Sequence, residues 1–171
     1  MSAVHIRKES PADEIAIRAL HNAAFESEAE ARLVDTLRLE ARPRISLVAM
    51  AGGRLIGHIL FTPVTLDGPN RDIHAVGLGP MAVHPERQRE GIGSQLVETG
   101  IARCWVERQD VIVVLGHPEF YPRFGFVPAD QFGLSCEWSV PSEAFMALEL
   151  KRGVLDGNGG RVRYHPVFTS H

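Results

Sequence analysis

Two glycines separated by one residue, Gly91 and Gly93, follow a polar turn at the start of an amphipathic stretch. Apolar residues in that stretch recur at helical spacing and predict a helix over residues 92–107. Residues 74–83 predict a strand, which His84-Pro85 ends. A strand that passes through such a turn into a helix directs backbone N–H groups and the positive end of the helix dipole at one point. The pattern therefore indicates an anion site that a pyrophosphate could approach closely, because glycines carry no side chain.

Other chemistries fit the sequence less well, although the glycine pair alone is also compatible with an ordinary strand-to-helix loop. Leu96 stands where the dinucleotide-binding fingerprint needs a third glycine, and neither a P-loop nor a Gly-x-Ser-x-Gly nucleophile elbow occurs. Cys104, Cys136 and the eight dispersed histidines have no metal-binding or redox spacing. We therefore expect no metal, and two reduced thiols rather than a disulfide.

The elements around the turn predict a mixed sheet with helices packed on it. Besides residues 74–83, the expected strands are residues 4–7, 46–50, 54–61, 111–115, 145–150 and 161–164. The other expected helices start at Pro11, after a Ser10 cap, and at Glu28, and they end at Phe25 and Leu39. Turns are expected at Gly52-Gly53, which predicts a hairpin, and at residues 67–70. On the helix after the glycines, the core side is expected to carry Val97, Ile101, Cys104 and Trp105.

Two spaced motifs give the sequence a resemblance to the GNAT superfamily of N-acetyltransferases. Gln88-x-x-Gly91-x-Gly93, directly after the strand that ends in Met81-Ala82-Val83, is similar to the acetyl-CoA signature of that family. Residues 111–115 followed by Tyr121-Pro122-Arg123-Phe124-Gly125-Phe126 are similar to its fifth strand and Tyr-x-x-x-Gly-Phe element. The order of elements agrees over nearly the whole chain. Residues 115–121 more narrowly resemble a branch of bacterial N-acetyltransferases of unassigned substrate.

The resemblance implies an α/β (α+β) GNAT fold. Its central sheet is mixed and mostly antiparallel, with about seven strands, helices on both faces and a splayed strand pair that binds the cofactor. A bulge around Gly77, Gly79 and Pro80 is expected to splay the fourth strand from the fifth.

The resemblance also implies acetyl-CoA as the co-substrate and assigns its contacts to positions in this chain. The main chain of Met81, Ala82 and Val83 is expected to bind the pantetheine arm. The turn that is expected to hold the pyrophosphate consists of Gln88, Arg89, Glu90, Gly91, Ile92, Gly93 and Ser94. Tyr121 and Phe124 complete the expected cofactor contacts.

Two departures from the family pattern concern side chains. Arg89 and Glu90 stand where the family often has glycine and then a basic residue. An acid beside a pyrophosphate is unfavourable unless it points to solvent or is offset by a base such as Arg87. Gly116-His117-Pro118 stands where the family frequently has asparagine after its fifth strand, so that contact is not carried over.

Acetyl transfer to an amine requires a neutral amine, a hydrogen-bond donor for the oxyanion and a proton for the departing thiolate. The resemblance implies that Tyr121 is the general acid, and the alternative is a packing role beside Phe120 and Phe124. The backbone N–H of Met81 is the expected oxyanion donor. The general base stays open between His117, which follows the fifth strand, the loop acids Glu26 and Glu28, and water.

The leading functional hypothesis is an acetyl-CoA-dependent N-acetyltransferase whose acceptor is an amine of a small molecule or a protein. It would act without a covalent enzyme intermediate. One alternative is a non-catalytic acyl-CoA sensor or interaction module on the same fold, and another is transfer of a longer acyl group or transfer to a hydroxyl. Trp138 and Phe145 either line an acceptor pocket or belong to the core.

Bulk properties agree with one globular domain over residues 1–171, because 44% of the residues are hydrophobic and 23% are charged. The net charge of −3 with scattered Lys and Arg argues against a nucleic-acid partner. The longest apolar run, residues 111–115, is too short to span a membrane, and no signal peptide is visible, so we expect a cytoplasmic protein without a membrane partner. Tyr164-His165-Pro166 is expected to form an edge strand that could serve a homodimer contact.

Overall fold

The computed structural model describes residues 3–42, 44–68 and 72–170, which fall into two compact units. The first unit comprises Met1–Thr62, Gly79–Arg103 and Pro166–His171, and the second comprises Pro63–Leu78 and Cys104–His165. Three long elements therefore contribute residues to both units: β3 (Arg54–Asp67), β4 (Ala75–Val83) and α3 (Ile92–Val106).

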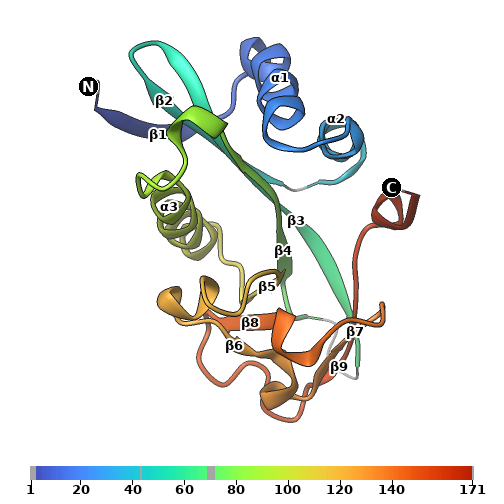
Figure 1. Cartoon of the computed structure of the whole chain (residues 1–171). Coiled ribbons are helices and arrows are strands. Elements are labelled where there is room, and N and C mark those ends of the chain that lie inside the picture. The colour runs from blue at the N-terminus through green and yellow to red at the C-terminus, as the bar shows by residue number, and fades with distance from the viewer. Residues whose placement is uncertain (1–2, 43, 69–71, 171) are drawn as a thin grey trace. The chain divides into compact units, whose positions relative to one another are not determined.

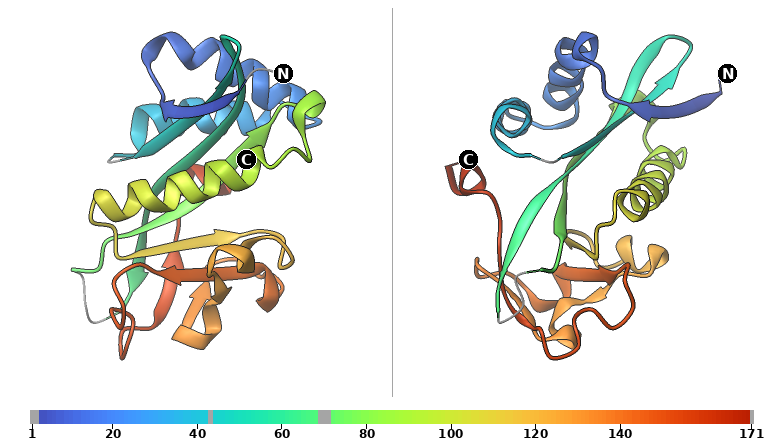
Figure 2. Two further views of the ribbon diagram at one scale, coloured as in Figure 1. Left: turned by 90° about the vertical axis from the view of Figure 1, so that its left-hand side faces the viewer. Right: turned by 180° about the vertical axis from the view of Figure 1, so that it is seen from behind.

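The first unit is a sheet with helices on both faces (Figures 1 and 2). β1 (Val4–Lys8) pairs antiparallel with β2 (Ile45–Ala51), and β2 pairs antiparallel with β3. The β2–β3 connection is the expected hairpin, in which Gly52 and Gly53 have φ angles of 56° and 76°. Helices α1 (Glu14–Ala24) and α2 (Ala29–Glu40) lie side by side on one face, and α3 lies on the other.

Alternation along the strands explains how one sheet serves both helical layers. Val48 and Leu60 point to α1 and α2, where they join a cluster of buried side chains that includes Ile17, Leu33, Val34, Leu37 and Ala41. Gly57 points to α3, where a Cβ would lie 3.0 Å from the Leu96 side chain. The missing side chain at Gly57 therefore allows α3 to pack close to β3.

The second unit is built on the other half of β4. β4 pairs in parallel with β5 (Val111–Leu115), which pairs antiparallel with β8 (Phe145–Glu149), and β8 pairs antiparallel with the two-residue strand β6 (Val127–Pro128). A second ladder joins β7 (Leu134–Cys136) in parallel to β9 (Gly160–Arg163), and β9 pairs antiparallel with the end of β3. The hydrophobic core of the second unit includes Val64, Val111, Val113, Leu134, Phe145, Ala147, Leu155 and Val162.

The β4–β5 ladder is short, as the expected irregularity in β4 requires. Its pairs run from Ala75 with Val111 to Leu78 with Val114. The next residue, Gly79, has a φ angle of 136° and is joined to Pro80 by a cis peptide bond. The strand continues beyond this point to Val83, in the first unit.

Most predicted elements are present within two residues of their expected bounds, but two details of the sequence analysis are wrong. Trp105 is 62% exposed, because it lies about 100° around α3 from the buried Cys104 rather than on the same stripe. Tyr164-His165-Pro166 forms no strand: β9 ends at Arg163, lies between β3 and β7 rather than at an edge, and is followed by a 3-10 turn over Pro166–Ser170.

The number of strands and one predicted turn also differ from, or extend beyond, what the structure describes. The described residues form nine strands rather than about seven, because β6 and β7 are only two and three residues long and carry no visible alternation. The turn that we predict at residues 67–70 extends outside the described residues, since Pro69 and Asn70 are not among them.

The close approach of α3 to β3 generates a stability prediction at Gly100. A methyl group there would overlap the ring of Phe61, which is fully buried. We expect Gly100→Ala to lower the free energy of unfolding by about 1–2 kcal/mol, because overpacking outweighs the roughly 1 kcal/mol that alanine gains in helix propensity. Urea unfolding measures this change, with Thr99→Ala at the exposed neighbouring position as the control. Stabilisation by Gly100→Ala would contradict the packing described.

Candidate functional site

The turn between β4 and α3 has the strand–turn–helix form expected from the sequence. β4 ends at Val83, a single 3-10 turn covers Pro85–Arg87, and α3 begins at Ile92. Gly91 has a φ angle of 84°, in the left-handed region that favours glycine. A Cβ at Gly91 would meet no atom within 4 Å, so its backbone borders open space. Because the first N–H groups of a helix have no partner within the helix, the start of α3 offers donors to an anion.

Side chains within the turn fix its shape. The Gln88 side-chain amide donates to the backbone oxygen of Val83 across 3.1 Å and closes the turn. Arg87 Nε lies 3.0 Å from Glu90 Oε1, so the acid that departs from the family pattern is paired with a base. Arg89 is exposed and has a φ angle of 66°. The buried side chain of Ile92 fixes the start of α3 against the sheet beneath it.

The strand residues before the turn lie where the sequence places them. Ala82 is buried, whereas Met81 and Val83 are half-buried, as alternation along a strand requires. The backbone N–H of His84 donates to the oxygen of Ile56 across 2.8 Å, which holds the end of β4 beside β3. The predicted residues from Met81 to Ser94 are therefore one continuous segment of the first unit.

Tyr121 belongs to the second unit and opens a 3-10 turn, Tyr121–Phe124, after β5. Its ring makes edge contacts with Phe120 and Phe126, with centroids 5.0 and 5.7 Å away, and it covers Gly116 so closely that a Cβ there would overlap it. The Tyr121 residue is only 7% exposed, and burial raises its pKa to about 12. A phenol is protonated at neutral pH both at this pKa and at its ordinary value, and the protonated state is the one that a general acid requires.

The other candidate residues differ in their surroundings. Phe124 is half-buried, with its ring centroid 5.1 Å from that of Phe120. His117 is exposed, and its backbone oxygen accepts from the N–H of Phe120. Glu26 is exposed in the loop between α1 and α2, while Glu28 pairs with Arg32 at 2.7 Å on the surface. His117, Tyr121 and Phe124 thus share one segment of the second unit, and the two acids lie in the first.

Within the described part of the chain, no three His, Cys, Asp or Glu side chains gather into a group that could hold a metal ion. Over the same residues, every helix is too short or too polar to cross a membrane.

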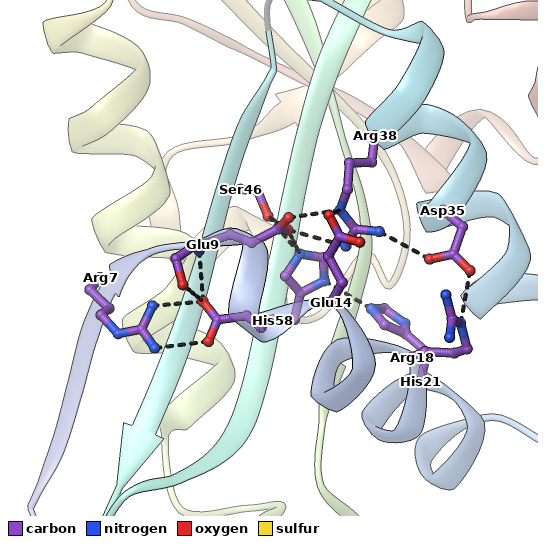
Figure 3. Close-up of polar contacts among 11 residues, drawn as sticks. Arg7, Glu9, Glu14, Arg18, His21, Asp35, Arg38, Ser46 and His58 are labelled. Carbon is purple, nitrogen blue, oxygen red and sulfur yellow. Dashed lines mark hydrogen bonds and ion pairs between the residues drawn. The ribbon is translucent and has the colours of Figure 1, made fainter.

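A buried polar cluster in the first unit, shown in Figure 3, is not predicted from the sequence. Glu9 accepts hydrogen bonds from Arg38 Nε at 2.7 Å and from the hydroxyl of Ser46 at 2.6 Å. Ser46 Oγ lies 2.8 Å from His58 Nε2, and His58 Nδ1 lies 2.9 Å from His21 Nε2. Both histidines are fully buried, and they occupy core positions of α1 and β3 where the pattern otherwise predicts apolar residues. Histidines at core positions are therefore the feature of the sequence that indicates a buried polar cluster.

The hydrogen positions in this cluster follow from the charge of Glu9. Its carboxylate can only accept, so the single hydroxyl hydrogen of Ser46 points to Glu9. His58 Nε2 must then donate to Ser46, and its Nδ1 must accept from His21 Nε2. Nδ1 of His21 remains an acceptor that has no hydrogen-bond partner among the described residues. The cluster is a polarised chain in which both histidines are neutral.

The electrostatics agree with this assignment. Burial, helped by the positive charge of Arg38, lowers the pKa of His21 to about 3, and burial also lowers the pKa of His58. Burial alone would raise the pKa of Glu9, but the facing His58 ring, the Arg38 guanidinium and the Ser46 hydroxyl outweigh it and hold the pKa far below its usual range. Asp35, one turn before Arg38 in α2, binds the other side of Arg38 at 3.0 Å and also accepts from Arg18 Nε of α1 at 2.9 Å, so it links α1 to the Arg38 end of the cluster.

Comparison with known proteins identifies the class. The family model of the acetyltransferase (GNAT) domain matches residues 5–129. The uncharacterized N-acetyltransferase YhbS of Escherichia coli K12 is 38% identical over 165 residues, which cover 96% of this chain and 98% of that protein. The chain therefore belongs to the GNAT acetyltransferase family, as the two motifs indicate.

Solved structures agree in fold. The crystal structure of Escherichia coli YhbS in complex with CoA has a TM-score of 0.92 at 35% identity, covering 99% of this chain and 93% of that one. A GNAT family acetyltransferase from Brucella melitensis in complex with acetyl-CoA has a TM-score of 0.79 at 35% identity, covering 98% and 99%. The predicted GNAT fold is confirmed.

The buried cluster generates a prediction about acid stability. In the unfolded chain His21 titrates near 6.5, whereas in the folded chain its pKa is about 3, so the unfolded state binds more protons between these values. Stability is therefore full above about pH 6.5 and falls as the pH decreases, by about 2 kcal/mol between pH 6.5 and pH 5 for His21 alone. Glu9, whose pKa is also lowered, adds to the loss below about pH 4.5.

Urea unfolding over this pH range measures the loss. His21→Leu is expected to make the curve between pH 6.5 and pH 5 shallower by the contribution of His21, while His58 still titrates and the exposed control His117→Gln keeps the full slope. A wild type equally stable at both pH values would show that the buried histidines are not held neutral.

Proposed function

We propose that the chain is an acetyl-CoA-dependent N-acetyltransferase that moves an acetyl group directly to an amine. The observation that carries this proposal is the turn at Gly91, whose left-handed backbone borders open space at the start of α3. Such a turn suits a pyrophosphate, because unpaired N–H groups and the helix dipole both favour an anion. The CoA and acetyl-CoA complexes of the two solved relatives support the same cofactor class.

The chain's own residues take the following roles in this proposal. The backbone from Gln88 to Ser94 binds the pyrophosphate, and the side chain of Gln88 keeps the turn in shape. Glu90 does not repel the phosphates strongly, because Arg87 neutralises it and Arg89 adds a positive charge in the same turn. The main chain of Met81, Ala82 and Val83 is the site of the pantetheine arm, and Phe124 contacts the cofactor beside Tyr121. Bound acetyl-CoA supplies the acetyl thioester.

The proposed chemistry uses few side chains. The neutral amine nitrogen forms a bond to the acetyl carbon and later loses a proton, the carbon–sulfur bond breaks, and Tyr121 gives its proton to the departing thiolate. Tyr121 is protonated at neutral pH, as a phenol is at its ordinary pKa of about 10, so it has a proton to give. The backbone N–H of Met81 is the oxyanion donor. His117, exposed just after β5, is the proposed base for the amine proton.

Cofactor binding is tested by calorimetry with acetyl-CoA. Gly91→Glu is expected to weaken binding at least about tenfold, because it places a side chain and a negative charge where the pyrophosphate binds. Gly157→Glu is the matched control. Gly157 also has a positive φ angle, 72°, and open space around it, but it lies in the loop before β9. Absence of binding by the wild type, or equal binding by both variants, would contradict the proposed site.

The acid role is tested by release of the CoA thiol in the presence of an amine that the wild type acetylates. Tyr121→Phe is expected to lower kcat about a hundredfold and to leave acetyl-CoA binding unchanged, because only the transferable proton is lost. Full activity of Tyr121→Phe would remove Tyr121 from the mechanism. Tight acetyl-CoA binding without thiol release for any amine would favour a non-catalytic acyl-CoA sensor instead.

A further inference from the structure

The second unit contains a cavity of about 260 Å³, and Trp138 and Phe145, for which the sequence leaves a pocket or a core position open, both line it. It is lined by Asp130, Leu134, Ser135, Cys136, Trp138, Ser139, Val140, Ser142 and Phe145. The ring of Trp138 stacks on Tyr164, with centroids 4.9 Å apart, and Tyr164 in turn lies over Gly77 of β4. An aromatic wall with a few polar groups is the usual composition of a small-molecule site, and the volume suits a small ligand.

The cavity lies at the same end of the second-unit sheet as Tyr121. Phe145, which lines it, pairs with Leu115 at the end of β5. The preceding residue, Ala144, accepts a hydrogen bond at 2.9 Å from the N–H of Gly116, the glycine that Tyr121 covers. A ligand in the cavity would therefore be bound close to the segment that carries the proposed general acid.

The charge of the cavity selects its ligand. Among the described residues that line it, Asp130 is the one charged side chain, and three serines supply neutral hydrogen-bonding groups. Asp130 and Trp138 line the same cavity, and a carboxylate attracts a cation by ion pairing while an aromatic ring attracts one by the cation–π interaction. The site therefore favours a cationic group and disfavours an anionic one.

The cation in the cavity differs from the nitrogen that reacts. The reacting amine must be neutral, whereas a carboxylate stabilises the charged form of its partner. Position agrees. Pro128 of β6 pairs with β8, and β8 pairs with β5, so Pro128 is about two strand spacings, roughly 10 Å, from β5. Asp130 follows Pro128 by two residues, in the 3-10 turn Ala129–Phe132. A flexible molecule with basic groups at both ends can span such a separation.

We infer that the acceptor is a small dibasic amine, with one cationic nitrogen bound by Asp130 and Trp138 while its other, neutral nitrogen accepts the acetyl group. This inference rests on the proposed function for the transfer step itself. In that step the free nitrogen bonds to the acetyl carbon and loses a proton, and the CoA sulfur leaves and gains one. The nitrogen at Asp130 keeps its charge throughout.

The test compares α,ω-diaminoalkanes, from diaminobutane to diaminooctane, with monoamines of the same length at saturating acetyl-CoA. The wild type is expected to show kcat/KM at least about tenfold higher for the best diamine than for its monoamine. Asp130→Asn is expected to remove this preference and to leave the KM for acetyl-CoA unchanged. Glu143→Gln, an exposed acid of the neighbouring 3-10 turn outside the cavity lining, is the matched control and should keep the preference.

Calorimetry with the diamines alone separates this inference from the proposed function. Diamine binding that Asp130→Asn and Trp138→Leu both weaken, and Glu143→Gln does not, supports the cavity even if no amine is acetylated. The cavity assignment is overturned if the enzyme acetylates amines but does not prefer diamines. It is also overturned if the Asp130→Asn variant keeps the preference for diamines. In both cases the proposed acetyltransferase activity still stands. Absence of diamine binding by the wild type overturns it as well. Thermal unfolding of each variant checks that the fold is intact.

Discussion

The passage from strand to helix between Val83 and Ile92 is the constraint on which the proposed chemistry depends. Within eight residues the backbone must leave an extended strand, reverse through left-handed conformations and enter α3 with its first N–H groups facing outward. The Gln88 side chain holds the turn closed, and the Arg87–Glu90 pair balances its charge. In the proposed function the backbone supplies the donors, so that site would tolerate unusual side chains such as Glu90, where the sequence departs from the family pattern.

A second constraint fixes the scaffold beneath that turn. The buried carboxylate of Glu9 is stabilised by direct donors from Arg38 of α2 and Ser46 of β2, and Ser46 continues the chain of hydrogen bonds through His58 of β3 to His21 of α1. Each of those elements is therefore tied to the same charge. The cluster orders the helical layer on one face of the first-unit sheet, while close packing at Gly57 and Gly100 orders α3 on the other.

The sequence reveals the features that are encoded locally. Gly52-Gly53 specifies a hairpin, the apolar period specifies α3, and the spacing of Gln88, Gly91 and Gly93 specifies the turn. What it does not reveal depends on distant partners. His21 and His58 meet across 37 positions of the chain, and nothing near either residue shows the contact. Likewise, β7 is defined only by its pairing with β9, and the cavity at Asp130 is lined by residues of both β7 and β8, which are separate in the sequence.

The most direct test of the central claim is a crystal structure of the chain in complex with acetyl-CoA. The account predicts the pyrophosphate against the backbone N–H groups of Gln88 to Ser94, and the hydroxyl of Tyr121 within hydrogen-bond distance of the thioester sulfur. A pyrophosphate bound elsewhere, or a sulfur out of reach of Tyr121, would contradict the assignment of the turn or of the acid.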